Sequence, residues 1–450
     1  MGKRLFGTDG VRGLANREPI TAKTALRLGY AIAEQCLLRP SSRHKILVGT
    51  DTRVSCSMLE AALAAGICSR GADVLLAGIM PTPGIAFLTV NMRCDAGVVI
   101  SASHNPYEDN GIKVFASDGF KLSDDEELAL ENSMLDDNEC TDGLSGGLVG
   151  KTRGVEDALG RYIVFVKSIL PREFNLDGIR LVLDCANGAG YKAAPYVFEE
   201  LGASVTTMAA EPDGYNINHE CGSLHPEPMC ELVRHTTADV GVALDGDADR
   251  VIFADQQGQV VDGDQIMGLI AWDLIKRQQL KKKTLVATVM SNMGLEVAMR
   301  GMGGDLVRTP VGDRYVVERM RRDGYNFGGE QSGHLIFLDH NTTGDGIMAA
   351  LEVLRVIIDT GKPLSELASM VKKFPQLLKN IPVKHRKNLE EMKDVKKAMD
   401  EARRLLGTSG RLLVRYSGTQ PICRVMAEGE DFEIVNKAVQ TVADALSRSS

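Results

Sequence analysis

The sequence predicts an α/β protein with three similar α/β domains, each built on a mixed, largely parallel sheet, and a smaller C-terminal α+β domain, all arranged around a central cleft. Three observations predict this architecture. The length of 450 residues is about three times that of a typical domain. A fixed order of strand, turn, helix, strand and polar loop occurs three times along the chain. Residues 372–406 then change to dense mixed charge before a new strand-like run begins at Leu412.

The repeated unit begins with an apolar, strand-like run and ends in a polar loop. The runs cover residues 45–49, 179–184 and 284–289. The loops that close the three units cover residues 101–104, 245–250 and 329–334. In an open α/β sheet, ligands bind beyond the carboxyl ends of the strands. We therefore expect the three loops to converge on one cleft, although alternation of strands and helices is common to every α/β protein.

Changes in composition between these units predict the domain boundaries. The acidic segment 122–160 ends in Gly-rich sequence and suits a closing helix with a linker, and a second break lies near residues 256–258. The charged segment after residue 371 marks the third break. The expected domains are residues 1–157, 158–257, 258–371 and 372–450.

Composition and charge exclude several classes of protein. A chain with 44% hydrophobic and 25% charged residues is neither disordered nor fibrous. The longest nearly apolar stretch, residues 266–272, is far shorter than the roughly 20 residues of a membrane span. No apolar run follows the first charges, so no secretory signal is expected. The net charge of -8 argues against nucleic acid or a membrane as a partner. We expect a cytoplasmic protein whose nine scattered cysteines are reduced and mostly buried.

The most informative loop is DGDADR at residues 245–250. Three carboxylates at alternate positions can converge only if the backbone turns, and we expect Gly246 to permit the turn. Hard oxygen ligands of this kind suit Mg²⁺ or Ca²⁺. An EF-hand is excluded because its required Gly and Glu positions hold Arg250 and Gln256. Because Mg²⁺ prefers six ligands, a water or phosphate oxygen is expected to complete the site; a solvated Asp-rich turn is the alternative.

The second loop, SASHNP at residues 101–106, places Ser103 beside His104 on a tight turn. A serine next to a histidine can act as a nucleophile, although a turn with ordinary caps has the same sequence. No Gly-x-Ser-x-Gly surrounds this serine, which disfavours an α/β-hydrolase. Lys113 follows in an alternating strand, within one loop's reach of Ser103.

Three further loops carry side chains suited to anions or sugars. Residues 415–424 combine hydroxyls, a flexible glycine and two guanidinium groups, which favours phosphate binding over a plain turn. Glycines expose Glu330, Gln331 and Ser332, whose side chains suit hydrogen bonds with sugar hydroxyls. Near the start of the chain, Arg12 lies on a glycine-hinged loop.

Two apparent motifs fail on inspection. Residues 146–152 resemble a nucleotide P-loop, but the required first glycine falls on Ser145. A phosphatase of the haloacid dehalogenase class would require Thr at the position of Asp249. Both classes are therefore disfavoured.

Taken in order, the five loops resemble those of the α-D-phosphohexomutase superfamily over the whole chain. The resemblance implies an intramolecular phosphotransferase in which Ser103 is phosphorylated and one Mg²⁺ per subunit is bound. The implied metal ligands are Ser103, Asp245, Asp247 and Asp249. The implied substrate-binding residues are Arg250, Glu330, Ser332, Arg415, Ser417, Gly418, Thr419 and Arg424. The superfamily usually has Glu where this chain has Gln420.

The resemblance also implies a mechanism. Phosphoserine donates its phosphoryl group to the sugar, and a bisphosphate intermediate turns over in the cleft before it returns the other group. Arg12 supplies positive charge, and Lys113 is the first candidate for proton transfer, with His104 second. A lysine with an ordinary pKa near 10.4 would need Arg12 or burial to lower it.

Within the superfamily, the opening FGTDGVRG and Gln331 favour the branch that acts on glucosamine phosphates. The implied reaction interconverts glucosamine 6-phosphate and glucosamine 1-phosphate through glucosamine 1,6-bisphosphate and feeds UDP-N-acetylglucosamine and cell-wall precursor synthesis. A phosphomannomutase or phosphoglucomutase is the alternative. A non-catalytic sugar-phosphate sensor and a metal-dependent phosphatase are more distant ones. The expected partner is a small sugar phosphate, and a homodimer is compatible with these expectations.

Overall fold

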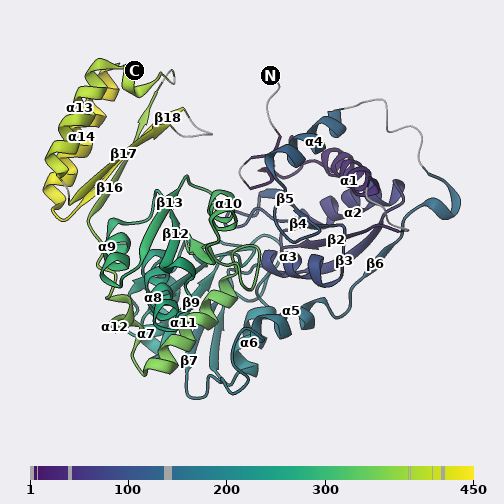
Figure 1. The fold of residues 1–450 in the computed structure, drawn as a ribbon. Helices are drawn as coiled ribbons and strands as arrows, with labels where there is room; N and C mark the ends of the chain where they lie inside the picture. Colours follow the sequence, from purple (N-terminus) through teal and green to yellow (C-terminus); the bar gives the residue numbers. More distant parts are fainter. Residues whose placement is uncertain are drawn as a thin grey trace. The chain divides into compact units, whose positions relative to one another are not determined.

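The structure is a computed structural model that describes residues 5–7, 9–38, 43–135, 144–383, 385, 387–407, 409–416 and 421–449 (Figure 1). The chain divides into two compact units. The first combines residues 1–289 with 307–369, and the second combines residues 290–306 with 370–450. The described residues form four β-sheets, and each is taken in turn below.

The first sheet has the strand order β1-β5-β4-β2-β3-β6. Strands β2, β3, β4 and β6 are parallel, whereas β1 and β5 run antiparallel to their neighbours. The strands are β1 (Val11–Leu14), β2 (Lys45–Thr50), β3 (Asp73–Ile79), β4 (Ala96–Ile100), β5 (Asp109–Ala116) and β6 (Thr152–Gly154). The helices are α1 (Ala22–Leu37), α2 (Cys56–Ser69), α3 (Thr82–Asn91) and α4 (Asp124–Leu135).

Helices cover both faces of this sheet, as Figure 1 shows. On one face, α1, α2 and α4 share an apolar core with alternate strand residues such as Ile46 and Val48. On the other face, α3 approaches so closely that a Cβ on Gly49 or Gly97 would contact its side chains. Because both faces are buried, β2 and β4 are almost wholly apolar, as strands in parallel sheets generally are.

The second sheet has the order β11-β10-β9-β7-β8, with β7 parallel to β8 and β9 and the remaining pairs antiparallel. The strands are β7 (Arg180–Asp184), β8 (Ser204–Met208), β9 (Val240–Leu244), β10 (Val251–Ala254) and β11 (Val260–Val261). The helices are α5 (Ala158–Lys167), α6 (Ala193–Glu200) and α7 (Glu227–Thr236). An apolar stripe on α7, which includes Met229 and Val233, packs against Val182 of β7.

The third sheet has the order β13-β12-β14-β15. The strands are β12 (Thr284–Thr288), β13 (Asp305–Thr309), β14 (Phe327–Gly329) and β15 (Leu335–Phe337). The helices of this part of the first unit are α8 (Gly263–Lys276), α10 (Asp313–Asp323), α11 (Gly346–Thr360) and α12 (Leu364–Ala368), whereas α9 (Met293–Gly301) belongs to the second unit. A capping box between Asp262 and Gln265 starts α8.

The fourth sheet lies in the second unit and is wholly antiparallel, with the order β16-β18-β17. The strands are β16 (Gln376–Pro382), β17 (Gly410–Tyr416) and β18 (Ile422–Gly429). Two amphipathic helices, α13 (Lys393–Leu406) and α14 (Phe432–Ser449), share one apolar core with the sheet. Short 3₁₀ turns elsewhere cover Gly146–Leu148, Lys281–Lys283 and Leu389–Glu391.

These sheets confirm the predicted α/β repeats and the smaller α+β region. The three predicted strand runs form β2, β7 and β12, and the predicted strand at Leu412 is β17. The domain boundaries stay predictions. In the described part of the chain the cysteines are free, and no helix combines the length and apolar character that crossing a membrane requires.

Candidate active site

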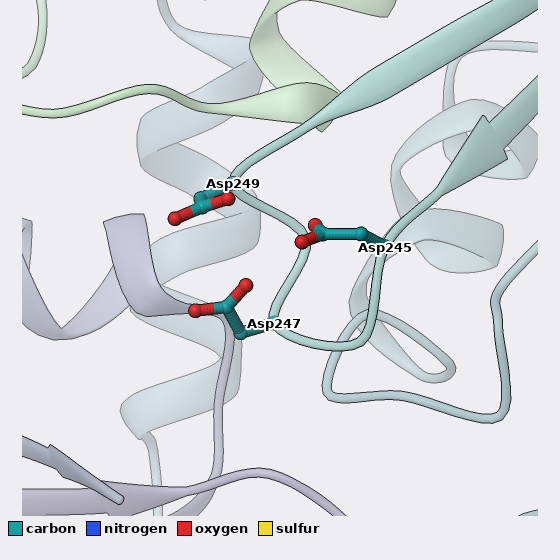
Figure 2. Close-up of side chains that lie close together, drawn as sticks. All are labelled: Asp245, Asp247 and Asp249. Carbon is teal, nitrogen blue, oxygen red and sulfur yellow. The ribbon is translucent and has the colours of Figure 1, made fainter. Parts of the chain in front are cut away.

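Three aspartates converge in the loop between β9 and β10. Asp245, Asp247 and Asp249 are buried, and one carboxylate oxygen of each lies within 4.8 Å of the others. Figure 2 shows the three side chains pointing toward one another. The residue in the left-handed conformation is Ala248, with φ of 57°. The expectation that Gly246 supplies the turn is therefore wrong.

Glycine is needed at position 246 for a different reason, because other atoms approach its Cα closely. A Cβ added there would lie 2.5 Å from the Ser103 carbonyl oxygen and 2.7 Å from Asn218 Nδ2. Real Cβ atoms do not approach other atoms so closely, so the loop carrying Ser103 can lie against the acidic loop only because residue 246 has no side chain.

Two helix N-termini hold the acidic loop in place. At the start of α3, the Thr82 amide donates to the Asp247 carbonyl oxygen at 3.0 Å, and Thr82 Oγ1 donates to Asp247 Oδ2 at 2.7 Å. At the start of α11, the Gly346 amide donates to the Ala248 carbonyl oxygen at 3.0 Å. The unpaired amides at helix N-termini are natural donors to such a loop.

Ser103 lies directly against these carboxylates. Its Oγ donates a hydrogen bond to Asp245 Oδ2 at 2.6 Å and lies 3.2 Å from His104 Nδ1. The serine has φ of 52° and is buried, and its amide donates to Ser101 Oγ at 2.9 Å. The structure thus brings together the serine and the acidic loop, as the repeat pattern predicts.

Lys113 on β5 is buried among carboxylates. Its Nζ lies 2.8 Å from Asp247 Oδ2, 3.4 Å from Asp249 Oδ2 and 3.2 Å from Asp9 Oδ2. Burial alone would lower the pKa of Lys113, but the three carboxylates outweigh burial and raise it. The expectation of a lowered lysine pKa does not hold here, and Lys113 stays an ammonium ion. Arg12 pairs with Asp9 beside it.

His104 is neutral at pH 7. Burial, with the charges of Arg250 and Arg12, lowers the pKa of its imidazole to about 4. The neutral ring can accept a hydrogen bond at whichever nitrogen carries no proton, and its low pKa makes it a weak base.

The cations of the protein act unevenly on the acidic loop: although burial opposes it, Lys113 and His334 hold the pKa of Asp249 well below its ordinary value, whereas Asp245 is shifted the other way. Burial first, and then Asp249 and Asp247, raise the pKa of Asp245 well above its ordinary value. Among the described residues, the buried Asp247 Oδ1 accepts no hydrogen bond. Convergent carboxylates with an unpartnered buried oxygen fit a hard divalent cation.

The loop between β14 and β15 lies beside the acidic loop. Its Gly333 carbonyl oxygen accepts a hydrogen bond from the Val251 amide at 3.1 Å. Glu330 is buried, and its Oε1 accepts from the Gly312 amide at 3.1 Å. Ser332 is half-buried. Arg250 is half-buried, and its Nε lies 3.8 Å from Asp249 Oδ1.

The predicted phosphate loop is only partly described. Ser417, Gly418, Thr419 and Gln420 lie outside the described residues. Arg415 on β17 and Arg424 on β18 are opposite each other in the antiparallel register. Burial and the charge of Arg424 lower the pKa of Arg415. Within the described part of the second unit, the Nε atoms of both arginines have no hydrogen-bond partner, which leaves donors for an anion.

Sequence reasoning missed several residues of this site. His334 Nδ1 lies 3.4 Å from Asp249 Oδ1, and its Nε2 accepts from the Gly344 amide at 3.1 Å. Asp9 contacts Lys113, and Arg53 and Asn218 contact the serine loop. The sequence offered a signal for three of them. Asp9 lies in the opening motif FGTDGVRG, His334 closes the loop at residues 329–334, and Arg53 follows the strand-like run at residues 45–49.

The fold and the site together define a phosphohexomutase: three α/β sheets, a C-terminal antiparallel sheet and a serine facing converging carboxylates. The chain belongs to the phosphoglucomutase/phosphomannomutase family. The family models for α/β/α domains I, II and III match residues 3–140, 161–258 and 262–374, and the C-terminal domain model matches residues 378–445.

Curated relatives of high identity belong to one branch of this family. The chain is 55% identical to a phosphoglucosamine mutase from Anaeromyxobacter sp. (strain Fw109-5), over 99% of this chain and 96% of that protein. It is 54% identical to a phosphoglucosamine mutase from Syntrophotalea carbinolica, over 100% of this chain and 98% of that protein. These relatives place the chain beside the phosphoglucosamine mutases of the family.

Solved structures share the fold at lower identity. A phosphoglucomutase/phosphomannomutase family protein from Burkholderia thailandensis superposes with a TM-score of 0.81 at 22% identity, covering 100% of this chain and 98% of that one. An N-acetylphosphoglucosamine mutase from Aspergillus fumigatus, in complex with GlcNAc-6P and magnesium, gives 0.62 at 18% identity, covering 98% and 96%. At these identities the likeness establishes the fold.

Proposed function

We propose that this chain interconverts glucosamine 6-phosphate and glucosamine 1-phosphate as a phosphoglucosamine mutase. One observation carries the proposal: the Ser103 hydroxyl lies 2.6 Å from a carboxylate of the convergent aspartate loop. The names of the curated relatives support the choice of sugar. We also propose that the reaction takes place in the cytoplasm and feeds UDP-N-acetylglucosamine and cell-wall precursor synthesis.

The proposed reaction is two phosphoryl transfers. In the first, the bond between phosphorus and Ser103 Oγ breaks as the sugar's free hydroxyl forms a bond to phosphorus and loses its proton. This yields glucosamine 1,6-bisphosphate, the activator and intermediate. The bisphosphate turns over, and its other phosphoryl group returns to Ser103, which leaves the isomeric monophosphate. Such transfers depend on in-line positioning and charge stabilisation.

The aspartate loop fits one Mg²⁺. Asp245, Asp247 and Asp249, with a phosphate oxygen carried on Ser103, would hold the ion, and when bound it neutralises charge on the transferred phosphoryl group. The supporting observations are the convergent oxygens and the unpartnered Asp247 Oδ1 among the described residues.

The chain's own cations have distinct parts in the proposal. Lys113 and Arg12 remain charged, because carboxylates raise their pKa values despite burial, so they attract and orient the anionic phosphoryl group. Of the two predicted proton carriers, only His104 is in a neutral form that can accept a proton. Arg250 adds a third positive charge beside Asp249.

Other residues are assigned to binding the substrate. Glu330 and Ser332 hydrogen-bond the sugar hydroxyls. Arg415, Ser417, Gly418, Thr419 and Arg424 bind the distal phosphate. Arg415 and Arg424 are opposite each other in the strand register, and their Nε atoms have no hydrogen-bond partner among the described residues, which supports this assignment.

The test compares Ser103→Ala with the wild-type protein and with Ser369→Ala, an exposed serine far along the chain. We expect Ser103→Ala to abolish both mutase activity and transfer of labelled phosphate from glucosamine 1,6-bisphosphate to the protein. The Ser369→Ala control should match the wild type. Near-normal activity of Ser103→Ala would contradict the mechanism.

The same assay separates the alternatives. Glucosamine, mannose and glucose 6-phosphates are offered side by side, and free phosphate is measured with each. Preference for mannose or glucose phosphate would indicate a phosphomannomutase or phosphoglucomutase. Free phosphate without isomerised sugar would indicate a metal-dependent phosphatase.

A further inference from the structure

The backbone around Ser103 is strained. Ser103 has φ of 52°, and Asn218, whose side chain contacts the Ser103 carbonyl, also has a positive φ of 58°. Residues other than glycine rarely adopt this conformation, and it persists only where surrounding contacts impose it. The contacts that impose it on Ser103 can be identified.

Two side chains bind the same pair of carbonyl groups in the serine loop. The Ser103 carbonyl oxygen accepts from Arg53 Nη2 at 3.1 Å and from Asn218 Nδ2 at 2.9 Å. The Asn105 carbonyl oxygen accepts from the same two nitrogens at 2.6 and 3.0 Å. Each donor thus bridges both carbonyls, which fixes the peptide group that follows Ser103 and the peptide group that follows Asn105.

Arg53 is itself rigidly held. It is buried, its guanidinium pairs with Asp51, and its amide donates to Asp51 Oδ1 at 2.9 Å. Both residues follow β2, whose carboxyl end lies next to that of β4, the strand that leads into the serine loop. A planar guanidinium anchored in this way offers donors in a fixed geometry.

Asn218 reaches the serine loop from the second sheet's side of the site. Its amide donates to the Ala186 carbonyl oxygen at 2.9 Å. Two residues shortly before Asn218 make further contacts. The Gly214 carbonyl oxygen accepts a hydrogen bond from the Val54 amide at 2.9 Å, and the Tyr215 ring packs edge-on against the Tyr107 ring. The chain between residues 213 and 218 therefore contacts the serine loop through Asn218, and it also contacts Tyr107 just after that loop and Val54 next to Arg53.

We infer that Arg53 and Asn218 are positioning residues for Ser103. Their contacts are with the backbone of the loop, and by fixing its carbonyls they hold the serine in the left-handed conformation that turns Oγ toward Asp245. The close approach of Gly246 to both Ser103 and Asn218 shows how little room the arrangement leaves. This inference rests on the proposed mutase function, because it concerns the serine that receives the phosphoryl group.

The test uses Asn218→Gly, which keeps the left-handed backbone accessible and removes only the amide side chain. The matched control is Asn16→Gly, since Asn16 is also left-handed, with φ of 61°, but exposed. We expect kcat of Asn218→Gly to fall about 10- to 100-fold, because small misplacements of a reacting group cost that much. We expect KM for glucosamine phosphate to stay within about twofold of the wild type.

A second variant covers the case in which Asn218→Gly folds poorly. Asn218→Asp keeps the shape of the side chain but places a carboxylate oxygen against the Ser103 and Asn105 carbonyl oxygens, which cannot donate a hydrogen bond to it. We therefore expect kcat to fall at least as far as in Asn218→Gly. Intact mass after charging with glucosamine 1,6-bisphosphate measures how fast each protein loses its phosphate. We expect faster loss in both Asn218 variants than in Asn16→Gly. Activity is expressed per folded molecule, with the folded fraction taken from circular dichroism.

Each outcome has one meaning. If both Asn218 variants keep wild-type kcat and phosphate retention per folded molecule, Asn218 is merely structural and the inference is wrong. If kcat is unchanged and only KM rises, the residue acts on the substrate, which also overturns the inference. If the wild-type protein itself shows no mutase activity, the proposed function fails instead.

Discussion

Ser103 and Asp245 lie 142 positions apart in the sequence, yet the serine hydroxyl donates a 2.6 Å hydrogen bond to the aspartate carboxylate. One residue follows β4 of the first sheet and the other follows β9 of the second. This hydrogen bond joins the loop proposed to carry phosphate to the loop proposed to bind metal. The predictions below test how that junction is built.

Asp247→Asn should weaken metal binding. The substitution removes one anionic ligand from three, and the amide it introduces faces the Lys113 ammonium and the Thr82 hydroxyl. We expect the Mg²⁺ concentration at half-maximal activity to rise about tenfold or more. Mg²⁺ titration of activity and Mn²⁺ binding by electron paramagnetic resonance both measure the change. Asp157→Asn, at an exposed aspartate, is the control, and equal Mg²⁺ curves for the two variants would contradict the metal assignment.

Lys113→Met should destabilise the metal-free protein. Removing the ammonium leaves Asp247 and Asp249 buried without the cation that they share, whereas Asp9 keeps Arg12 and Lys121. Loss of one partner from a buried ion pair typically costs about 3–5 kcal/mol in the free energy of unfolding. Urea denaturation with and without Mg²⁺ measures the change in the free energy of unfolding. Mg²⁺ should restore part of the lost stability.

The control for this lysine is Lys362→Met. Lys362 pairs with Glu366 in a largely exposed position, where such pairs contribute about 0–1 kcal/mol. If both variants lose the same small amount of stability, Lys113 does not compensate the buried carboxylates.

Gly246→Ala should disrupt the site although it adds only one carbon. The new Cβ would lie 2.5 Å from the Ser103 carbonyl oxygen, so the serine loop must shift. We expect mutase activity to fall about 100-fold, the size of effect that a misplacement near 1 Å produces. Steady-state kinetics measure it.

Gly160→Ala is the matched control for the glycine substitution. Gly160 lies in α5, is exposed, and an added Cβ would meet no atom within 4 Å. Since alanine favours helix more than glycine, this variant should gain about 0.5–1 kcal/mol of stability and keep its activity. Full activity in Gly246→Ala would show that the two loops do not approach as described.

Asp184 should make stability depend on pH. It is buried at the end of β7, and burial raises its pKa from 3.8 to about 6, although the Gly222 and Ala186 amides donate to it. The folded protein therefore binds this proton more tightly than the unfolded chain does. This group's contribution to stability is greatest below about pH 4 and decreases by about 3 kcal/mol as pH rises through 6.

Asp184→Asn isolates that contribution, because the neutral amide resembles the protonated acid. The difference in unfolding free energy between wild type and variant should change between pH 4 and 6 and be constant above pH 7. Urea denaturation at a series of pH values measures it. A difference independent of pH would mean that the pKa of Asp184 is not raised.

Local pattern was sufficient to predict the strands. The apolar runs that become β2, β7 and β12 are recognisable because residues buried on both faces of a sheet must be apolar, which is visible in a short segment. The C-terminal strand β17 was found in the same way. Ser103 and the aspartate loop were predicted to meet because equivalent ends of repeats point to one edge.

The roles of Gly246 and Lys113 were not predictable in this way. A glycine between two aspartates predicts a turn, but glycine is required at position 246 because the Ser103 carbonyl oxygen approaches it, and Ser103 lies 142 positions before Asp245. The pKa of Lys113 depends on three carboxylates, of which Asp9 lies in a different loop from the other two. The sequence around Gly246 does not predict the nearby Ser103 carbonyl, and the sequence around Lys113 does not predict the nearby Asp9 carboxylate.

The amino-acid order alone therefore determined the repeated α/β architecture, the acidic triad and the serine loop, because each is a pattern of residues close together in the chain. Tertiary structure alone decided which donors hold the serine backbone and which charges surround the buried lysine. Hydrogen bonds from Arg53 and Asn218, and charge from Asp9, act over a few ångströms in space. Strand pairing within the first sheet brings Arg53 and Asp9 within that range, and contact with a loop of the second sheet brings Asn218 there.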